Sequence, residues 1–184
     1  MTTDIDARPT LLRRLRLPAA TAYMWVMLLL LGAIVLETLM IYPNVFADPP
    51  ASLALTMDFL AVTGPDDFFP PFGLAGWVLG AAALLTCWGQ RDARGWIVLS
   101  LAALVCEGIV SVLYFWPRNE ILFSEGLAVH SAEYLVQVAR EFESWHWASR
   151  MVFNATAAVG AFVAFLRVHR ARVLATTATL VTAR

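Results

Sequence analysis

Four stretches of the chain are apolar over about the length that a helix needs to cross a lipid bilayer. They cover residues 19–41, 72–88, 96–116 and 148–166. A membrane-spanning helix requires roughly 20 predominantly apolar residues, and the shorter second stretch contains no charged residue at all. The sequence therefore predicts an all-α membrane protein, a four-transmembrane-helix bundle that forms a single domain over residues 1–184.

The composition agrees with a chain that is surrounded by lipid. Hydrophobic residues make up 60% of the 184 residues and charged residues only 15%, against about 45–50% and about 25% in soluble domains. The net charge of −1 provides no basic field for nucleic acid. Cys87 and Cys106 lie within apolar stretches and lack the CxxC spacing of disulfide-exchange enzymes. We therefore expect the lipid bilayer as a partner and exclude nucleic acid.

The arginines predict how the bundle is oriented. All 13 positive residues are arginine, and ten of them lie near the chain ends or between the second and third apolar stretches. These ten are Arg8, Arg13, Arg14, Arg16, Arg91, Arg94, Arg167, Arg170, Arg172 and Arg184. Because arginine accumulates on the cytoplasmic side, we expect a multi-pass protein of the plasma (inner) membrane. Both termini would be cytoplasmic, with basic tails at residues 1–18 and 168–184.

Two long segments on the opposite side are expected to be outer loops that carry short interfacial helices. Residues 44–71 hold four aspartates and no arginine, with a short helix expected at 52–62. Residues 117–147 have apolar side chains three or four positions apart, which predicts an amphipathic helix that continues into the fourth span. The apolar face of that helix would contain Leu135, Val138, Phe142 and Trp145.

Three glycines of the second stretch, Gly73, Gly76 and Gly80, share one helical face. Small residues at this spacing let a neighbouring helix approach closely. The neighbour is either another helix of this chain or a partner, so a homo-oligomer remains open at this point.

Ionisable residues inside the predicted spans mark the candidate site. A charged side chain there costs about 2.5–3.5 kcal/mol on the insertion scale, and only Glu37 and Glu107 clearly lie within a span. In the fourth span His146, Arg150 and Asn154 are four residues apart and share a helical face. We expect Arg150 to pair with one of the two glutamates. The set is either a structural ion pair or, as we favour, a polar pocket in the outer half of the bundle.

Some of these residues also suit a metal ion. Carboxylate and imidazole groups in a helical bundle bind iron, manganese or copper. The candidates are Glu37, Glu107, His130 and His146, although they show no ExxH or HxxxH spacing. A site without any cofactor is the alternative.

Two segments in the second half of the chain resemble a known family. Tyr114–Phe123 ends a membrane helix with an aromatic-Pro-x-Asn sequence, and Glu143–Arg150 opens the last helix. With these segments, residues 111–161 resemble the anthrone oxygenase-like family of small four-helix membrane proteins. That family tends to have an Asn after helix three, then a Trp, a His or Asn, and an Arg at the start of helix four.

The resemblance implies an activity. Members with known roles oxidise polyketide anthrones to anthraquinones with dioxygen and without a classical cofactor. The matching positions are Asn119, His146 and Arg150. The family's His or Asn usually lies three residues before the Arg, whereas His146 lies four before it and Trp147 occupies the nearer position.

Oxidation of an anthrone begins with loss of a proton from its central methylene carbon. A histidine or a carboxylate serves as the base, an arginine or an asparagine stabilises the resulting oxyanion, and aromatic side chains hold a flat substrate. The expected catalytic residues are His146, Arg150, Asn119, Glu107 and Glu37. The expected substrate-binding residues are Tyr114, Trp145, Trp147, Asn154 and Asn44.

We therefore expect a membrane-bound oxygenase or oxidase of a lipophilic aromatic substrate that is anthrone- or quinol-like. The alternative is a non-enzymatic membrane protein, either a ligand-binding protein or an accessory subunit of a larger complex.

Overall fold

The computed structural model describes residues 7–182, with side chains described for residues 11–178, 180 and 181. The ends of the predicted tails, 1–6 and 183–184 with Arg184, lie outside the described residues, as does the side chain of Arg8. The elements are α1 (Ala7–Leu36), η1 (Glu37–Ile41), α2 (Tyr42–Val45), α3 (Ala51–Phe59), α4 (Pro65–Thr86), α5 (Arg91–Val110), η2 (Ser111–Phe115), α6 (Trp116–Asn119), η3 (Glu120–Glu125), α7 (Gly126–Val129), α8 (Ala132–Trp145), η4 (His146–Met151) and α9 (Val152–Thr182), where η marks a π-helical turn.

These elements join into four long rods within the described residues. The rods Leu11–Val45, Pro65–Thr86, Arg91–Val129 and Ala132–Ala178 are long and apolar enough to cross a membrane. The all-α class and the four apolar helices predicted from the sequence are therefore confirmed. Large side chains such as Trp25 and Leu85 lie on the outside of the bundle, 57% and 69% exposed, as expected where the surroundings are lipid.

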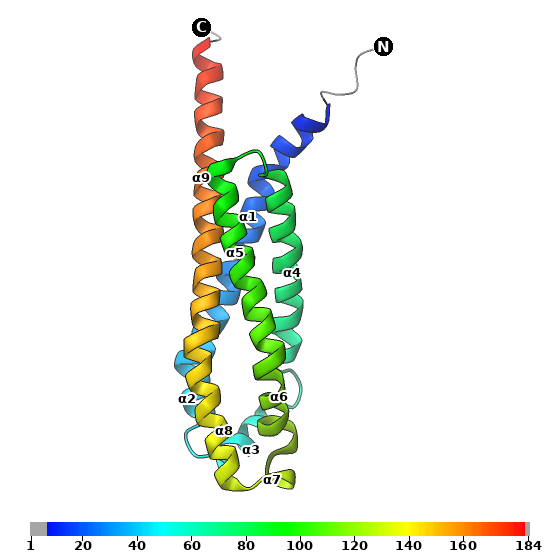
Figure 1. Cartoon of the computed structure of the whole chain (residues 1–184), viewed down its shortest axis with the longest axis vertical. Coiled ribbons are helices and arrows are strands. Elements are labelled where there is room, and N and C mark those ends of the chain that lie inside the picture. Colours follow the sequence, from blue (N-terminus) through cyan, green and yellow to red (C-terminus); the bar gives the residue numbers. More distant parts are fainter. Residues whose placement is uncertain (1–6, 183–184) are drawn as a thin grey trace.

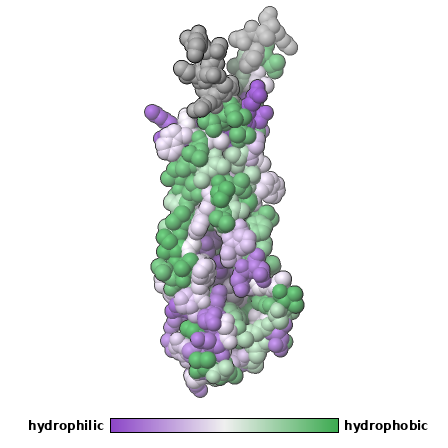
Figure 2. Space-filling model, turned by 90° about the vertical axis from the view of Figure 1, so that its right-hand side faces the viewer, coloured by the Kyte–Doolittle hydropathy of each residue, from purple (hydrophilic) through white to green (hydrophobic). Residues whose placement is uncertain are grey.

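The rods run side by side, and their connections fall at two distinct ends (Figure 1). α1 begins and α9 finishes at the same end as the turn between α4 and α5. The short elements α2, α3, α6, α7 and α8 lie at the opposite end. Hydrophobic residues cover much of the bundle's side, and hydrophilic residues gather in the half that holds the short elements (Figure 2).

The helices extend beyond the apolar windows of the sequence. α4 begins at Pro65 rather than at residue 72, and the third rod continues through Pro117 instead of ending near it. The predicted outer segment at 117–147 is helical almost throughout, with α6, η3, α7 and α8 in it, and only residues 130 and 131 separate α7 from α8. The predicted continuation of its amphipathic helix into the fourth span is confirmed. The first outer segment retains a short helix, α3, close to the predicted position.

Two rods contain a π-helical turn that ends two residues before a proline. η1 precedes Pro43 and η2 precedes Pro117. Proline lacks an N–H, and its ring clashes with the carbonyl four residues earlier, which falls within the π turn in both cases. The wider π turn, with i→i+5 hydrogen bonds, accommodates the ring. It also inserts one residue into the helical repeat and so rotates the side chains before it relative to those after it.

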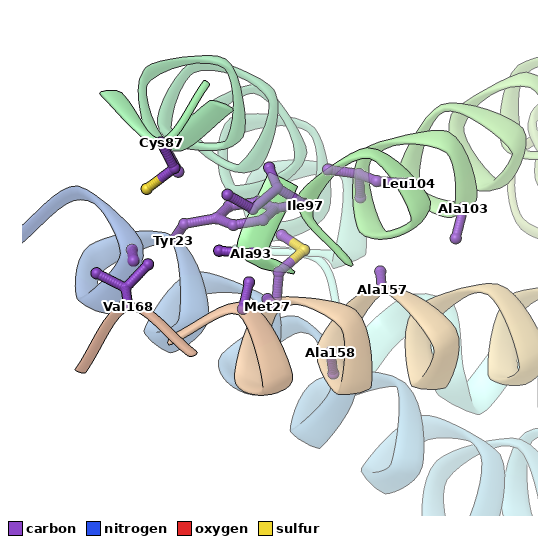
Figure 3. Packing of buried hydrophobic residues seen from close by; sticks show 14 of the residues in the cluster. Tyr23, Met27, Cys87, Ala93, Ile97, Ala103, Leu104, Ala157, Ala158 and Val168 are labelled. Carbon is purple, nitrogen blue, oxygen red and sulfur yellow. The ribbon is translucent and has the colours of Figure 1, made fainter. Parts of the chain in front are cut away.

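The upper core lies near the α4–α5 turn and is built from α1, α4, α5 and α9 (Figure 3). Tyr23 and Ile97 are almost completely buried there. The hydroxyl of Tyr23 lies 2.7 Å from Oγ of Ser100, and Oγ of Ser100 donates to the carbonyl of Ala157 at 2.6 Å. This chain of polar groups joins three rods inside an otherwise apolar core, and each group has a partner, as buried polar groups require.

Glycines bring the rods of the upper core close together. A Cβ on Gly76 would lie 2.6 Å from Met27, and one on Gly80 would lie 2.8 Å from Tyr23 of α1. The predicted close approach is therefore made within the chain for these two glycines. Gly73 does not take part, because a Cβ there would meet nothing within 4 Å. This internal packing removes the glycine face as an argument for a partner protein.

The lower core lies at the opposite end and forms around α8. The strong amphipathic pattern of α8 buries Leu135, Val138 and Phe142, as predicted, against Tyr42 and Phe115. The polar side of α8 stays outside this core, which explains why a segment too polar to span a bilayer still folds as a helix. Trp145 was wrongly predicted to join the buried face, because its side chain is 49% exposed.

Candidate functional site

A polar layer separates the upper core from the lower core. On the first rod, residues 37 and 38 lie between the buried residues of the upper core and those of the lower core. Residues 107–111 of the third rod and residues 146–154 of the fourth rod also lie between the two cores. The members of the polar layer are Glu37, Thr38, Glu107, Ser111, His146, Ser149, Arg150 and Asn154. Hydrophilic residues in a recess of the apolar side are visible in this half of the bundle (Figure 2).

Arg150 and Glu107 form an ion pair within the polar layer. Nε of Arg150 donates to Oε1 of Glu107 at 3.0 Å, and the two side chains are only 10% and 14% exposed. Oγ of Ser111 donates to the same carboxylate oxygen at 2.8 Å. The guanidinium also lies over the rings of Phe69 and Phe115, 5.0 and 5.3 Å from their centroids. Of the two predicted partners of Arg150, the structure therefore selects Glu107.

Asn154 continues this arrangement along the fourth rod. It is buried, and its Nδ2 donates to the carbonyl of Arg150 at 2.9 Å. The predicted alignment of His146, Arg150 and Asn154 is confirmed, since all three side chains are buried on the inner face of η4 and α9.

Glu37 faces His146 instead of Arg150. Oε2 of Glu37 and Nε2 of His146 lie 3.6 Å apart, which is too long for a hydrogen bond. Both atoms are buried, and neither has a hydrogen-bond partner within the described chain. Burying an unpaired polar atom costs about 1–3 kcal/mol, so two such atoms facing each other set this part of the polar layer apart.

The other ring nitrogen of His146 is held by Thr38. Oγ1 of Thr38 lies 2.9 Å from Nδ1 and also donates to the carbonyl of Ile34 at 2.6 Å. Both Glu37 and Thr38 belong to the π turn η1, whose wider turn reduces the angle between successive side chains. This geometry explains how two adjacent residues face one imidazole.

Aromatic rings of the lower core surround the imidazole. The ring centroid of His146 lies 4.6 Å from that of Tyr42, 5.9 Å from that of Phe115 and 6.2 Å from that of Phe142. With His146 only 1% exposed, its Nε2 is shielded from solvent. Charges interact strongly in such a place.

Three predicted site residues lie away from the polar layer. Asn44 is exposed, and its Nδ2 donates to the carbonyl of Met40. In a regular helix Asn44 would share a face with Glu37, but the intervening π turn rotates it outward. Trp147 is 46% exposed on the outside of η4. Asn119 is half-buried on α6, and no described hydrogen bond joins it to the layer.

Tyr114 and Trp145 belong to a separate aromatic cluster. Their ring centroids lie 5.1 Å apart. The guanidinium of Arg118 stacks on Tyr114, 3.5 Å from its centroid, and its Nη2 donates to Glu141 at 3.2 Å. This cluster joins η2 and α6 to α8.

The four candidate metal ligands are not brought together. Nε2 of His130 contacts Oε2 of Glu125, within the loop end of the third rod. Among the described residues, no group of three or more His, Cys, Asp or Glu side chains could hold a metal ion. Glu37 and His146 alone would offer two ligand atoms. The four-ligand hypothesis was therefore wrong, because His130 points to a different neighbour.

Several residues of the site were missed in the sequence, among them Thr38 and Phe69. The sequence did not indicate that Thr38 belongs to the site. A hydroxyl side chain in an apolar helix usually donates to a carbonyl of the preceding turn, so its presence alone does not predict a functional role. Phe69 lies on α4, and the contact with Arg150 joins residues far apart in the chain. Only the packing of α4 against the other rods reveals it.

An open apolar groove lies on the outside of the third rod. It has a volume of about 400 Å³ and is lined by Trp77, Val105, Gly108, Ile109, Val112 and Leu113. Gly108 makes room for Trp77, whose ring would lie 2.9 Å from a Cβ at that position. The groove thus borders the third rod at the residue that follows Glu107 of the polar layer.

No protein-family model matches the chain, and no curated protein and no solved structure matches it significantly.

Proposed function

We propose that this protein is a membrane-embedded oxygenase or oxidase in which His146, paired with Glu37, removes a proton from a lipophilic aromatic substrate. The observation that carries the proposal is the unpartnered pair of atoms, Nε2 of His146 and Oε2 of Glu37, buried 3.6 Å apart. A purely structural pair would be expected to close to hydrogen-bond distance. An open pair that is screened from water is typical of a group that exchanges protons.

The charged groups of the polar layer suit a proton transfer within the site. The imidazolium that forms on His146 would face the carboxylate of Glu37. The substrate anion that is left would need a counter-charge, which the guanidinium of Arg150 offers. The total charge of the site with its substrate stays the same.

The Arg150–Glu107 pair has a supporting role in the proposal. Nε of Arg150 donates to Glu107. The remaining N–H groups of the guanidinium can donate to the oxygen of a deprotonated substrate. Such preorganised donors stabilise developing negative charge strongly where water is excluded. We assign no role to Asn119 in this scheme, because no described hydrogen bond joins it to the layer.

An anthrone- or quinol-like substrate is the class we propose, by the resemblance of residues 111–161 to the anthrone oxygenase-like family. The reaction balances with one dioxygen: the methylene loses both hydrogens, one oxygen atom becomes the new carbonyl oxygen, and the other leaves as water. The apolar groove beside Gly108 offers such a molecule a surface on the outside of the bundle.

We further propose that the polar layer lies in the outer half of the plasma (inner) membrane. Arg13, Arg16, Arg91 and Arg167 are located toward the end of the bundle where α1 starts and α9 finishes. Arginine-rich ends face the cytoplasm. The layer, in the opposite half, would therefore receive its substrate and dioxygen from the outer leaflet.

Oxygen consumption by the purified protein in lipid nanodiscs tests the proposal. An anthrone and a hydroquinone serve as substrates, and His146→Phe is compared with His169→Phe, a matched change of an exposed histidine. Glu37→Gln is compared with Glu120→Gln, a matched change of an exposed glutamate. We expect the changes in the layer to slow turnover by about 10²–10⁴-fold, the usual contribution of a general base, and the controls to leave it unchanged.

Two outcomes would contradict the proposal. Equal turnover in His146→Phe and His169→Phe would remove His146 as the base. Absence of oxygen consumption with both substrates, by protein whose thermal unfolding shows it to be intact, would overturn the assignment as an oxidase of this class.

A further inference from the structure

Thr38 determines which nitrogen of His146 is available to react. A threonine hydroxyl has one hydrogen to donate and two lone pairs with which to accept. The hydrogen of Thr38 is directed to the carbonyl of Ile34, at the shorter of its two contacts, 2.6 Å. The contact with Nδ1 of His146, at 2.9 Å, must then be one in which the hydroxyl accepts and the imidazole donates.

This donation has a direct consequence for the other side of the ring. A neutral imidazole carries its hydrogen on one nitrogen only. If Nδ1 carries it, Nε2 has a lone pair, and this lone pair faces Oε2 of Glu37 across 3.6 Å. Two acceptors then face each other, which explains why neither atom has a partner within the described chain and why the gap stays open.

We propose that Thr38 is a positioning residue that holds His146 as the Nδ1–H tautomer, so that Nε2 is the atom that accepts the proton and shares it with Glu37. Thr38 touches neither substrate nor reacting atoms and acts through the imidazole. The inference rests on the proposed function for its role in turnover, whereas the tautomer itself is a property of the resting protein.

The tautomer is measured by nitrogen-15 magnetic resonance of labelled histidine, independently of any activity. His130→Gln and His169→Gln leave His146 as the one histidine of the chain, so its two nitrogens are assigned without overlap. At a pH where the imidazole is neutral, we expect the hydrogen on Nδ1. Thr38→Ser, which keeps the hydroxyl, should retain this state, and Thr38→Val, which keeps the shape but removes the acceptor, should lose it.

Turnover provides the second measurement. We expect Thr38→Val to lower kcat by about tenfold, as loss of one positioning hydrogen bond would, and Thr38→Ser to recover most of it. Thermal unfolding of both variants shows whether the fold is kept.

The outcomes separate this inference from the proposed function. A hydrogen on Nε2 in the unsubstituted protein, or no change of tautomer in Thr38→Val, overturns the inference even if the protein is an oxidase. A hydrogen on Nδ1 that depends on the Thr38 hydroxyl supports it even if no substrate is oxidised, in which case only the proposed function fails.

Discussion

Nε of Arg150 donates to Oε1 of Glu107 at 3.0 Å, and so an ion pair joins the third and fourth rods in the middle of the bundle. His146, one turn earlier on the fourth rod, faces Glu37 of the first rod instead. The two carboxylates of the polar layer are therefore divided between two basic side chains. One pair is closed to hydrogen-bond distance, and the other is open.

The closed pair gives a stability prediction. Arg150→Leu leaves the carboxylate of Glu107 buried without its counter-charge and should lower the free energy of unfolding by about 3–5 kcal/mol. Replacing both partners, Arg150→Leu with Glu107→Leu, should recover most of that loss, because no unpaired charge remains. Thermal unfolding of the detergent-solubilised variants measures both effects. A double variant as unstable as the single one would contradict the assignment of a simple ion pair.

Close packing of α5 against α9 predicts a difference between two glycines. A Cβ on Gly160 would lie 2.9 Å from the backbone oxygen of Trp96 and from Cβ of Ser100. Gly160→Ala should therefore force the helices apart and destabilise the protein by about 1–3 kcal/mol. A Cβ on Gly95 meets nothing within 4 Å, so Gly95→Ala should be neutral or stabilising by up to about 1 kcal/mol. Equal unfolding temperatures for the two variants would show that this approach is looser than described.

The polar chain in the upper core predicts an asymmetry between its two hydroxyls. Ser100→Ala leaves the buried hydroxyl of Tyr23 without the partner at 2.7 Å and should cost about 1–3 kcal/mol. Tyr23→Phe should cost less, because Ser100 keeps its bond to the carbonyl of Ala157. In the double variant the two losses should not add, since they share one interaction. Additive losses in the unfolding free energies would argue against a direct hydrogen bond.

The proposed orientation predicts which positions react from outside the cell. In a background with Cys87→Ala and Cys106→Ala, a cysteine at exposed Ala128 should react with a membrane-impermeant maleimide in intact cells. A cysteine at exposed Asp92, at the opposite end of the third rod, should react only after the cells are opened. The reverse pattern would invert the orientation and place the polar layer in the cytoplasmic half.

Much of the fold follows from local properties of the sequence. The apolar windows predicted four rods, because the length of a predominantly apolar segment is enough to specify a spanning helix. The spacing of Leu135, Val138 and Phe142 predicted α8 and its buried face, which the structure confirms. The predicted ends of the rods were wrong. An amphipathic segment can continue a helix beyond its apolar part when a second core covers the apolar face of that segment, as the lower core does here.

The candidate site was predicted only as a set of residues. Charges inside spans pointed to Glu37 and Glu107, and helical spacing aligned His146 with Arg150. Which acid would pair with which base could not be derived, since it depends on how the rods are rotated. Asn44 was misplaced for the same reason, because a π turn changes the rotation of one rod.

The sequence by itself determined that the chain folds as four apolar helices with a few buried charges, because hydrophobic length and the cost of a charge in lipid are properties of each segment alone. Only the tertiary structure decided that Thr38 holds His146, that Glu107 takes Arg150 and that Glu37 is left facing Nε2. Those contacts join residues far apart in the chain. They depend on π turns and on glycine-mediated close packing, which set the rotation and spacing of whole helices.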